Sequence, residues 1–293
     1  MKKRKQNNLL LHLIMIILAL CCIVPLLIVV GVSLSSEADI SKYGYRLIPK
    51  KIDFGAYKYV FNNPRTILNA YKVTIFSTFV GTCISVLLMS MIAYPLSKKY
   101  FKGKKFVSTY VFITMIFSGG LVPTYLLNTK FLHLGDTLWI YILPSLINVW
   151  HVFMIRTFMS QLPDSIFEAA RIDGSNELYN YFIMALPMCK PVLATVALLG
   201  ALTRWNDWNT ALLYINKEEL VSLQYLLQRI LLDIQLLQEE GSNLESLGIQ
   251  LHEIPSESAR MAMAVIAAGP MLFVFPFFQK YFVHGLTVGA VKG

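Results

Sequence analysis

Long stretches without a charged residue are the feature that most limits what this chain folds into. Each stretch is close to the roughly 20 residues that a helix needs to cross the hydrocarbon core of a bilayer. They cover residues 6–36, 73–97, 106–129, 137–155 and 261–279. A further apolar segment, 188–214, has the right length but contains Arg204 and Asp207. The pattern predicts an all-α integral membrane protein with six transmembrane helices.

The composition agrees with this fold class. Of 293 residues, 56% are hydrophobic and only 15% are charged, whereas soluble domains have about a quarter charged. We expect helices at about 9–33, 70–97, 106–127, 137–158, 188–214 and 259–281. Gly119, Gly120 and Pro123 interrupt the third of these helices. This predicts either a broken helix that lines a cavity or a helix that ends there and turns.

The N-terminus raises the question of a cleaved signal. MKKRK followed by apolar residues is similar to a signal peptide, and the residues before Cys21 are similar to a lipoprotein cleavage box. Leu20 stands where such a box needs a small residue, and the apolar run continues to Val32. An uncleaved first helix is therefore favoured.

The net charge of +9 would suggest nucleic acid as a partner of a soluble protein. Here the positive residues gather on one predicted side of the membrane, so we expect no nucleic acid. They are Lys2, Lys3, Arg4, Lys5, Lys98, Lys99, Lys102, Lys104, Lys105, Arg171, Lys280 and Lys292. The positive-inside rule makes that side the cytoplasm, with both termini on it. The opposite loop, 33–72, also holds Lys and Arg, but it is longer and mixed with acidic residues.

A polar insert, about 160–187, interrupts the apolar pattern between the fourth and fifth helices. Ser165-Ile166-Phe167-Glu168 fits the capping box of a helix start, and Gly174 fits the left-handed position after a helix. A second helix would place Leu178, Tyr181, Phe182 and Ala185 on one apolar stripe. The insert is predicted to be two short helices at a corner.

The first of these helices has the composition of a docking element. Ala169 and Ala170 are small enough for another protein's backbone to approach closely. Glu168, Arg171 and Asp173 would form charge-assisted contacts around them. The alternative is a solvated surface loop without a partner.

Several polar residues within apolar segments are candidates for a substrate pathway. Arg204 and Asp207, spaced i, i+3, would pair and so lower the cost of charge in the membrane. Indole rings stack on sugars, and amides bind hydroxyls. The candidates are Tyr141, Asn148, His151, Arg204, Trp205, Asn206, Asp207 and Trp208. The alternatives are an interfacial tryptophan belt with a snorkelling arginine, and a structural histidine. No cysteine or histidine spacing indicates a metal site.

The segment 215–258, on the predicted outer side, contains an amphipathic helix. Gln224, Gln228, Gln235 and Gln238 fall on one face, and Leu223, Leu226, Ile230, Ile234 and Leu237 cluster elsewhere. The pattern indicates packing at the membrane surface or over a cavity, with docking of an extracellular binding protein as an alternative.

EAARIDG (168–174) followed by ALP (185–187) resembles the EAA loop of type I ABC importer permeases, the element that fits a groove on the ATPase subunit. The resemblance extends over about 70–293. It includes the flanking 154–159 and the Trp205-Asn206-Asp207-Trp208 run. The ending Gly289–Gly293 is similar to the tail of maltose-type permeases, and 117–127 is similar to the subgroup that imports complex oligosaccharides.

This resemblance implies the type I permease fold with cytoplasmic coupling helices: an N-terminal segment and first helix in 1–69, a transmembrane domain in 70–281 and a cytoplasmic tail in 282–293. It implies coupling to the ATPase by Glu168, Ala169, Ala170, Arg171, Asp173 and Gly174, and a tail reaching towards the ATPase through Gly289, Lys292 and Gly293. The chain has no phosphate-binding G-x-x-x-x-G-K-[ST] loop. ATP and Mg²⁺ would therefore be bound by a separate ATPase, and this chain would be no enzyme.

The implied function is one permease half of an importer of a sugar or oligosaccharide in the cell membrane. The implied partners are a second permease in a heterodimer, two ATPase subunits and an extracellular solute-binding lipoprotein, with lipid around the helices. The alternative is a self-sufficient ion-coupled secondary transporter, which would need several intramembrane carboxylates, whereas only Asp207 is present. The residues do not name the sugar.

Overall fold

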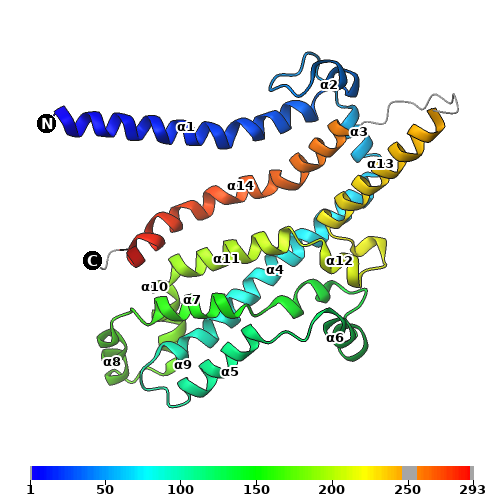
Figure 1. Ribbon diagram of the computed structural model, residues 1–293. Coiled ribbons are helices and arrows are strands. Elements are labelled where there is room, and N and C mark those ends of the chain that lie inside the picture. Colours follow the sequence, from blue (N-terminus) through cyan, green and yellow to red (C-terminus); the bar gives the residue numbers. More distant parts are fainter. Residues whose placement is uncertain (1, 246–255, 291–293) are drawn as a thin grey trace. The chain divides into compact units, whose positions relative to one another are not determined.

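The computed structural model describes residues 2–245 and 256–290, and throughout them the chain is helical, without a β-strand (Figure 1). The first elements are α1 (Lys2–Ser33), α2 (Glu37–Tyr43), α3 (Gly55–Val60), α4 (Pro64–Ser97), α5 (Lys104–Ile116), α6 (Leu121–Leu126), the π-helix η1 (Leu127–Phe131) and the 3₁₀ turns η2 (Leu138–Tyr141) and η3 (Leu143–Ser145). They are followed by α7 (Val149–Met159), α8 (Asp164–Ile172), α9 (Glu177–Tyr179), the π-helix η4 (Asn180–Ala185), α10 (Leu186–Met188), α11 (Lys190–Trp205), α12 (Asn209–Tyr214), the 3₁₀ turn η5 (Glu218–Leu220), α13 (Leu223–Glu245) and α14 (Glu257–Ala290).

Three helices among the described residues are long and apolar enough to cross a membrane, and up to six spans result if each bent helix pair counts as one. The three long spans are Leu9–Ser33, Pro64–Ser97 and Glu257–Phe277. The bent pairs are Lys104–Ile116 with Leu121–Phe131 (109°), Leu138–Ser145 with Val149–Met159 (52°), and Glu177–Met188 with Lys190–Trp205 (78°). These helices confirm the all-α membrane fold that the apolar segments of the sequence predicted.

The predicted interruption of the third helix near Gly119 and Gly120 is confirmed, whereas the expectation of continuous fourth and fifth helices was wrong. The third segment breaks at Gly120, whose φ of 85° lies in the left-handed region that suits glycine. In the fourth, Pro144 lies within 3₁₀ turns that precede α7. The fifth ends at Trp205 instead of continuing to 214, and α12 follows as a separate helix. The left-handed backbone of Gly120 explains the first break, and Pro144, which has no backbone N–H, explains the second.

The chain divides into two compact units. Unit 1 comprises Met1–Ile67 and Leu226–Pro270. In it Glu37, at the start of α2, accepts hydrogen bonds from the backbone N–H groups of Glu257 (3.1 Å) and Ser258 (3.3 Å). A carboxylate at this position satisfies free donors of a helix N-terminus and complements its dipole. The segment between α1 and α4 thus holds the beginning of α14.

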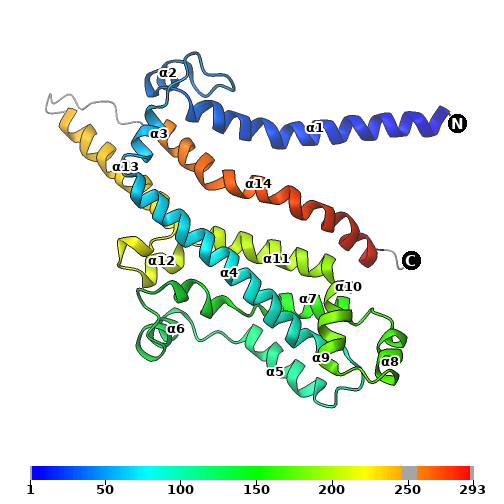
Figure 2. The same cartoon turned by 180° about the vertical axis from the view of Figure 1, so that it is seen from behind.

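Unit 2 comprises Leu68–Tyr225 and Met271–Gly293. Its core gathers side chains from α4, α7, α8, η4 and α11, elements that lie together in Figures 1 and 2. The fully buried members include Leu96, Ile155, Phe167, Ala185 and Val196. This core fixes the polar insert against the membrane helices of its own unit.

The amphipathic pattern of the segment after α12 is confirmed for the part that the structure describes. Leu223, Leu226 and Ile234 are buried, whereas Gln228 and Gln235 are exposed. Residues 246–255 of the predicted 215–258 segment lie outside the described residues.

Candidate functional site

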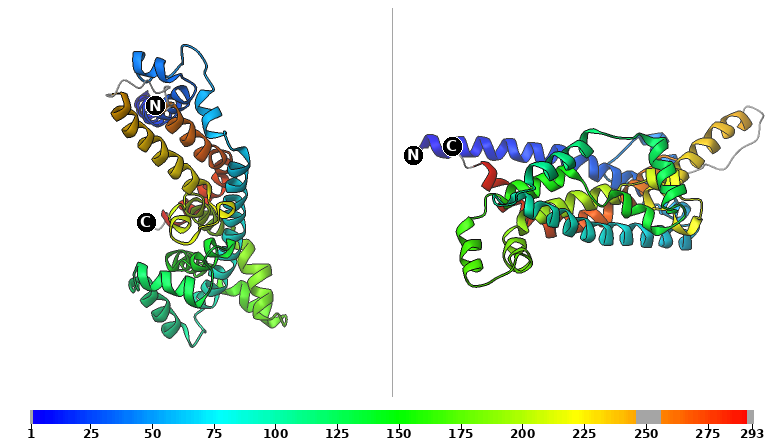
Figure 3. Two further views of the ribbon diagram at one scale, coloured as in Figure 1. Left: turned by 90° about the vertical axis from the view of Figure 1, so that its right-hand side faces the viewer. Right: turned by 90° about the horizontal axis from the view of Figure 1, so that it is seen from below.

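The polar insert forms the predicted corner of two short helices, which protrudes from the rest of unit 2 (Figure 3). Its first helix, α8, begins at Asp164, and Pro163 is its N-cap without a side-chain hydrogen bond. Ser165 therefore lies inside the first turn, so the predicted capping box from Ser165 to Glu168 was wrong. The exposed pair of Lys99 and Asp164, with N–O 3.0 Å, lowers the pKa of the Asp164 carboxyl through that hydrogen bond.

The end of α8 is a left-handed turn at Gly174, as the sequence predicts. Gly174 has a φ of 85°. Its N–H donates to the carbonyl of Arg171 (3.0 Å), and the N–H of Ser175 donates to the carbonyl of Ala170 (2.9 Å). This pair of bonds is the Schellman motif. Nothing lies within 4 Å of an added Cβ, so the backbone conformation alone requires glycine here.

The outer face of α8 is exposed and carries most of the predicted docking residues. Glu168, Ala169 and Asp173 are exposed, and the neighbouring Ile172 is 87% exposed. Beside them lies an open concave surface that encloses a volume of about 640 Å³. Its lining residues are Ile166, Ala169, Ala170, Asp173, Gly174, Ser175, Asn176, Tyr179 and Met184. The expectation that both alanines are available to a partner was wrong in part, because Ala170 is only 9% exposed.

The inner face of α8 is fixed by an aromatic residue and a buried lysine. Phe167 is 1% exposed, and its ring lies 6.4 Å from the Tyr94 ring of α4. The ammonium of Lys98 lies 3.0 Å from the centroid of the Phe167 ring. Burial lowers the pKa of Lys98 from 10.5 to about 8, although Asp164 and Glu177 oppose this effect. The contact is a cation–π interaction inside the corner.

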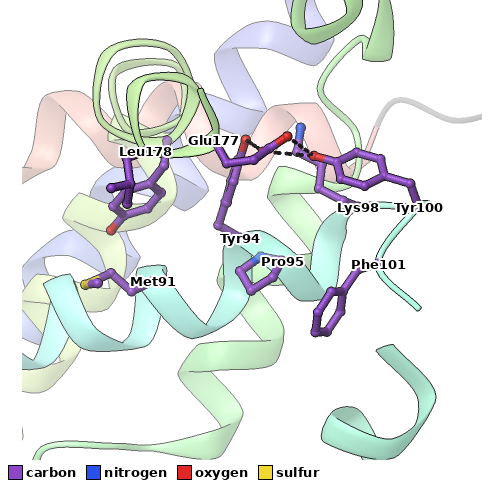
Figure 4. A pocket seen from close by; sticks show the side chains of 9 residues that line it. Met91, Tyr94, Pro95, Lys98, Tyr100, Phe101, Glu177 and Leu178 are labelled. Atoms are coloured by element: carbon purple, nitrogen blue, oxygen red, sulfur yellow. Dashed lines mark hydrogen bonds between the residues drawn. The ribbon is translucent and has the colours of Figure 1, made fainter. Parts of the chain in front are cut away.

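Glu177, in the first turn of α9, connects the corner to α4 and to the turn after it (Figure 4). Its carboxylate accepts hydrogen bonds from the hydroxyls of Tyr94 (3.0 Å) and Tyr100 (3.0 and 3.1 Å). Arg171 donates to it from Nε at 3.2 Å and stacks over the Tyr100 ring at 4.2 Å. Burial and the bond to Glu177 raise the pKa of Tyr100, so its hydroxyl stays a donor. Arg171 is thus engaged within the chain.

The second helix of the corner differs from the predicted apolar stripe. Asn176 caps it by accepting from the N–H of Tyr179 (2.7 Å). Tyr181 and Ala185 are buried as expected, but Leu178 and Phe182 are 64% and 46% exposed. The reason is that residues 180–185 form a π-helix, whose wider turn breaks the spacing of an α-helical stripe.

The predicted pairing of Arg204 with Asp207 was wrong. The pair needs a continuous helix, but α11 ends at Trp205. Arg204 donates from Nη2 to the carbonyl of Ser145 (2.8 Å) and to the Ser85 hydroxyl, and Asp207 accepts from the N–H of Thr210 (3.0 Å). Arg204 therefore binds α4 and η3, whereas Asp207 binds the first turn of α12.

The other pathway candidates separate into buried and accessible residues. Trp205 is 5% exposed and packs beside Tyr71, while Tyr141 is 4% exposed and its hydroxyl donates to the carbonyl of Leu220 (2.8 Å). Their rings are enclosed by the chain, which leaves no face for a sugar to stack on. Trp208 is 41% exposed, and Asn206 is exposed with its amide bonded to Gln224 (3.2 Å).

Asn148, His151 and Arg204 are brought together by the fold, although they come from two helices. Asn148 caps α7 by accepting from the N–H of His151 (3.3 Å). All three side chains line a cavity of about 160 Å³ within unit 2. Across the described ranges, no group of three or more His, Cys, Asp or Glu side chains is placed to hold a metal ion.

The predicted tail residues are only partly within the described structure. Gly289 belongs to α14, whereas Lys292 and Gly293 lie outside the described residues. Sequence analysis missed Glu177, Tyr94 and Lys98 as members of the corner. The signal for Glu177 was present, since it follows the capping Asn176 in the first turn of a predicted helix.

Comparison with known proteins relates most of the chain to transport-system permeases, although no protein-family model matches it. It is 39% identical over 269 residues to Protein LplC of Bacillus subtilis (strain 168), covering 92% of this chain and 89% of that protein. It is 35% identical over 269 residues to the polygalacturonan/rhamnogalacturonan transport system permease protein YtcP of the same strain, covering 92% of each. Among solved structures, it is similar to a bacterial ABC transporter involved in the import of the acidic polysaccharide alginate, with 29% identity, a TM-score of 0.78, and coverage of 96% of this chain and 98% of that chain.

Proposed function

Because this chain belongs to the permease subunits of carbohydrate ABC importers, we propose that it forms one half of a pathway through which a separate ATPase drives oligosaccharide uptake. Its partners would be a second permease in a heterodimer, two ATPase subunits and an extracellular solute-binding lipoprotein. ATP and Mg²⁺ would be bound by the ATPase. This chain would receive the resulting movement through a mechanical contact and would not bind the nucleotide. The solutes named for two similar proteins, polygalacturonan/rhamnogalacturonan and alginate, support a fragment of a polysaccharide as the cargo.

The observation that carries this proposal is the two-sided character of α8. Its outer face exposes Ala169 and Asp173 beside a concave surface. Its inner face is joined to α4 through Phe167 and to the next helix through Arg171 and Glu177. A force applied to the outer face would therefore reach α4 through packed and hydrogen-bonded groups. ATP binding would then shift the permease pair between inward and outward openings.

The test is co-purification of the ATPase in detergent from cells that express the complete importer. We expect a stoichiometric ATPase with the wild-type chain, and its loss with Ala169→Trp, because the larger side chain fills the concave surface. Ser160→Trp is the matched control, since Ser160 is exposed on the turn before α8 and outside that surface. A chain that transports alone in liposomes, or an Ala169→Trp variant that retains the ATPase, would refute the proposal.

The same proposal places α8 and both termini in the cytoplasm, where the lysines near α8, such as Lys98 and Lys99, agree with the positive-inside rule. A single cysteine at Ile172, in a variant whose native cysteines are replaced by serine, tests this orientation. A membrane-impermeant maleimide should label it in inside-out vesicles and not in intact cells. Labelling of intact cells would reverse the orientation.

A further inference from the structure

A polar cavity inside unit 2 contains an arginine without a charged partner. The cavity of about 160 Å³ lies between α4, η3, α7 and α11. Its polar lining includes Thr82, Ser85, Asn148, His151, Thr203 and Arg204. These groups belong to apolar segments of the chain, where a charged or polar side chain is costly and marks a functional site by default.

The position of Arg204 depends on a glycine of α4. A Cβ added to Gly81 would lie 2.6 Å from Nε of Arg204, so only glycine admits the guanidinium this close to the helix. There, Nη2 donates to the Ser85 hydroxyl and to the carbonyl of Ser145, and Nη1 donates to the carbonyl of Gly200 (3.3 Å). The guanidinium is held firmly, and every one of these acceptors is neutral.

The charge of Arg204 is therefore not balanced inside the cavity. Among the side chains that the structure describes, at 9–236 and 256–277, no carboxylate forms an ion pair with it. The Asp207 carboxylate, the closest acidic group along the chain, accepts from the N–H of Thr210. Two further donors, Nε of Arg204 and the hydroxyl of Thr82, are buried without a hydrogen-bond partner. A buried donor left unpaired costs free energy that a bound acceptor would recover.

An arginine with an excess of neighbouring donors fits a carboxylate better than a neutral hydroxyl. The guanidinium keeps its charge at any physiological pH and matches the plane of a carboxylate. A water molecule takes up about 30 Å³, so the cavity has room for a carboxylate and part of a sugar ring.

We propose that this cavity binds the carboxylate of an anionic sugar, with Arg204 as its counter-charge and Thr82 and Asn148 as hydrogen-bonding neighbours. This inference rests on the proposed function, since it concerns the cargo of the same pathway. It assigns selectivity for acidic over neutral sugars to this permease itself.

The experiment measures binding of digalacturonate and of its methyl ester to the detergent-solubilised importer complex, without the solute-binding protein. The two probes have the same sugar rings and differ in charge and in the methyl groups of the ester. We expect the acid to bind at least about tenfold more tightly than the ester, the difference that one charge-assisted hydrogen bond provides. Arg204→Gln should abolish this preference for the acid over the ester. Gly81→Ala should weaken it too, because it displaces the guanidinium without removing the charge.

Two controls separate loss of the site from loss of the fold. Arg156→Gln removes an arginine of α7 that stacks on Phe153, outside the cavity, and should keep the full preference. Arg204→Lys keeps the charge, loses the planar geometry and should give an intermediate preference in a complex with wild-type melting temperature.

Equal binding of acid and ester, binding of neither probe, or an unchanged preference in Arg204→Gln would overturn the inference. ATP-driven uptake of neutral oligosaccharides by the same complex would then leave the proposed function intact. A complex that imports no oligosaccharide would instead refute the proposed function.

Discussion

The Tyr94 hydroxyl donates a 3.0 Å hydrogen bond to the carboxylate of Glu177, which joins the end of α4 to the first turn of α9. The same carboxylate binds Arg171, which lies in the last turn of α8. One acidic side chain thus connects both helices of the corner to a helix that is long enough to cross the membrane.

We expect Glu177→Gln to lower uptake while the ATPase remains bound, because the ion pair with Arg171 is lost at the joint between α8 and α4. A double-mutant cycle with Tyr94→Phe should give a coupling energy of about 1 kcal/mol, since the carboxylate is half-exposed and screened. The measurement is thermal unfolding together with uptake per ATP hydrolysed. Tyr110→Phe, on the exposed face of α5, is the control and should change neither quantity. Additive effects of the two variants would contradict the direct link.

The turn at Gly174 should tolerate only residues that adopt a left-handed backbone. Gly174→Val is expected to cost about 1 to 2 kcal/mol of strain and to separate ATP hydrolysis from uptake. Gly174→Asn is the matched control, because asparagine accepts this conformation more readily than other residues. Uptake and ATPase rates in proteoliposomes decide the outcome. Normal uptake by Gly174→Val at normal expression would show that the turn carries no force.

Lys98 should titrate near pH 8. Its pKa is lowered to about 8 in the folded corner, against 10.5 when solvated, mainly because burial disfavours the charged form. The unfolded chain then binds more protons than the folded chain between these two values, so the stability contributed by this group rises with pH across that window and stays at its lower level below about 8.

Competitive acylation across the alkaline range, followed by mass spectrometry, measures this pKa. The same peptide in denatured protein is the reference and should return to the solvated value. A folded-state midpoint that coincides with the denatured one would mean that water reaches the ammonium beside Phe167.

Gly31 of α1 should not tolerate even alanine. An added Cβ would lie 2.5 Å from the carbonyl oxygen of Leu47 and 2.6 Å from that of Arg46, both of which are backbone atoms of unit 1. Overpacking of this kind costs about 1 to 3 kcal/mol. Thermal unfolding of Gly31→Ala should show this loss, whereas Gly269→Ala, whose Cβ would meet nothing within 4 Å, should be neutral or stabilising. Equal melting temperatures of the two variants would exclude a close approach at Gly31.

The sequence predicted the features that depend on neighbours along the chain. Apolar length located the six segments, and Gly174 marked the end of α8 because a left-handed turn favours glycine. The start of α8 was misplaced since Asp164 already belongs to the helix, ahead of the Ser165 that resembles a cap.

Contacts between distant residues were beyond local patterns. Glu177 meets Tyr94 and Tyr100, which lie 83 and 77 positions away, and no spacing rule connects them. The proposed Arg204–Asp207 pair failed because its i, i+3 rule holds only within one helix, and α11 ends between the two residues. The cavity around Arg204 likewise needed Gly81, whose only sequence signal was the glycine itself.

The adjacent alanines of α8 look interchangeable in the sequence, yet one faces outward and the other inward. Genetics should distinguish them. Second-site suppressors of a damaging change at Ala170 are expected inside this gene, because the injury is to the subunit's own packing. Suppressors of a change at Ala169 are expected in the gene of the motor subunit, which would identify that subunit without purification.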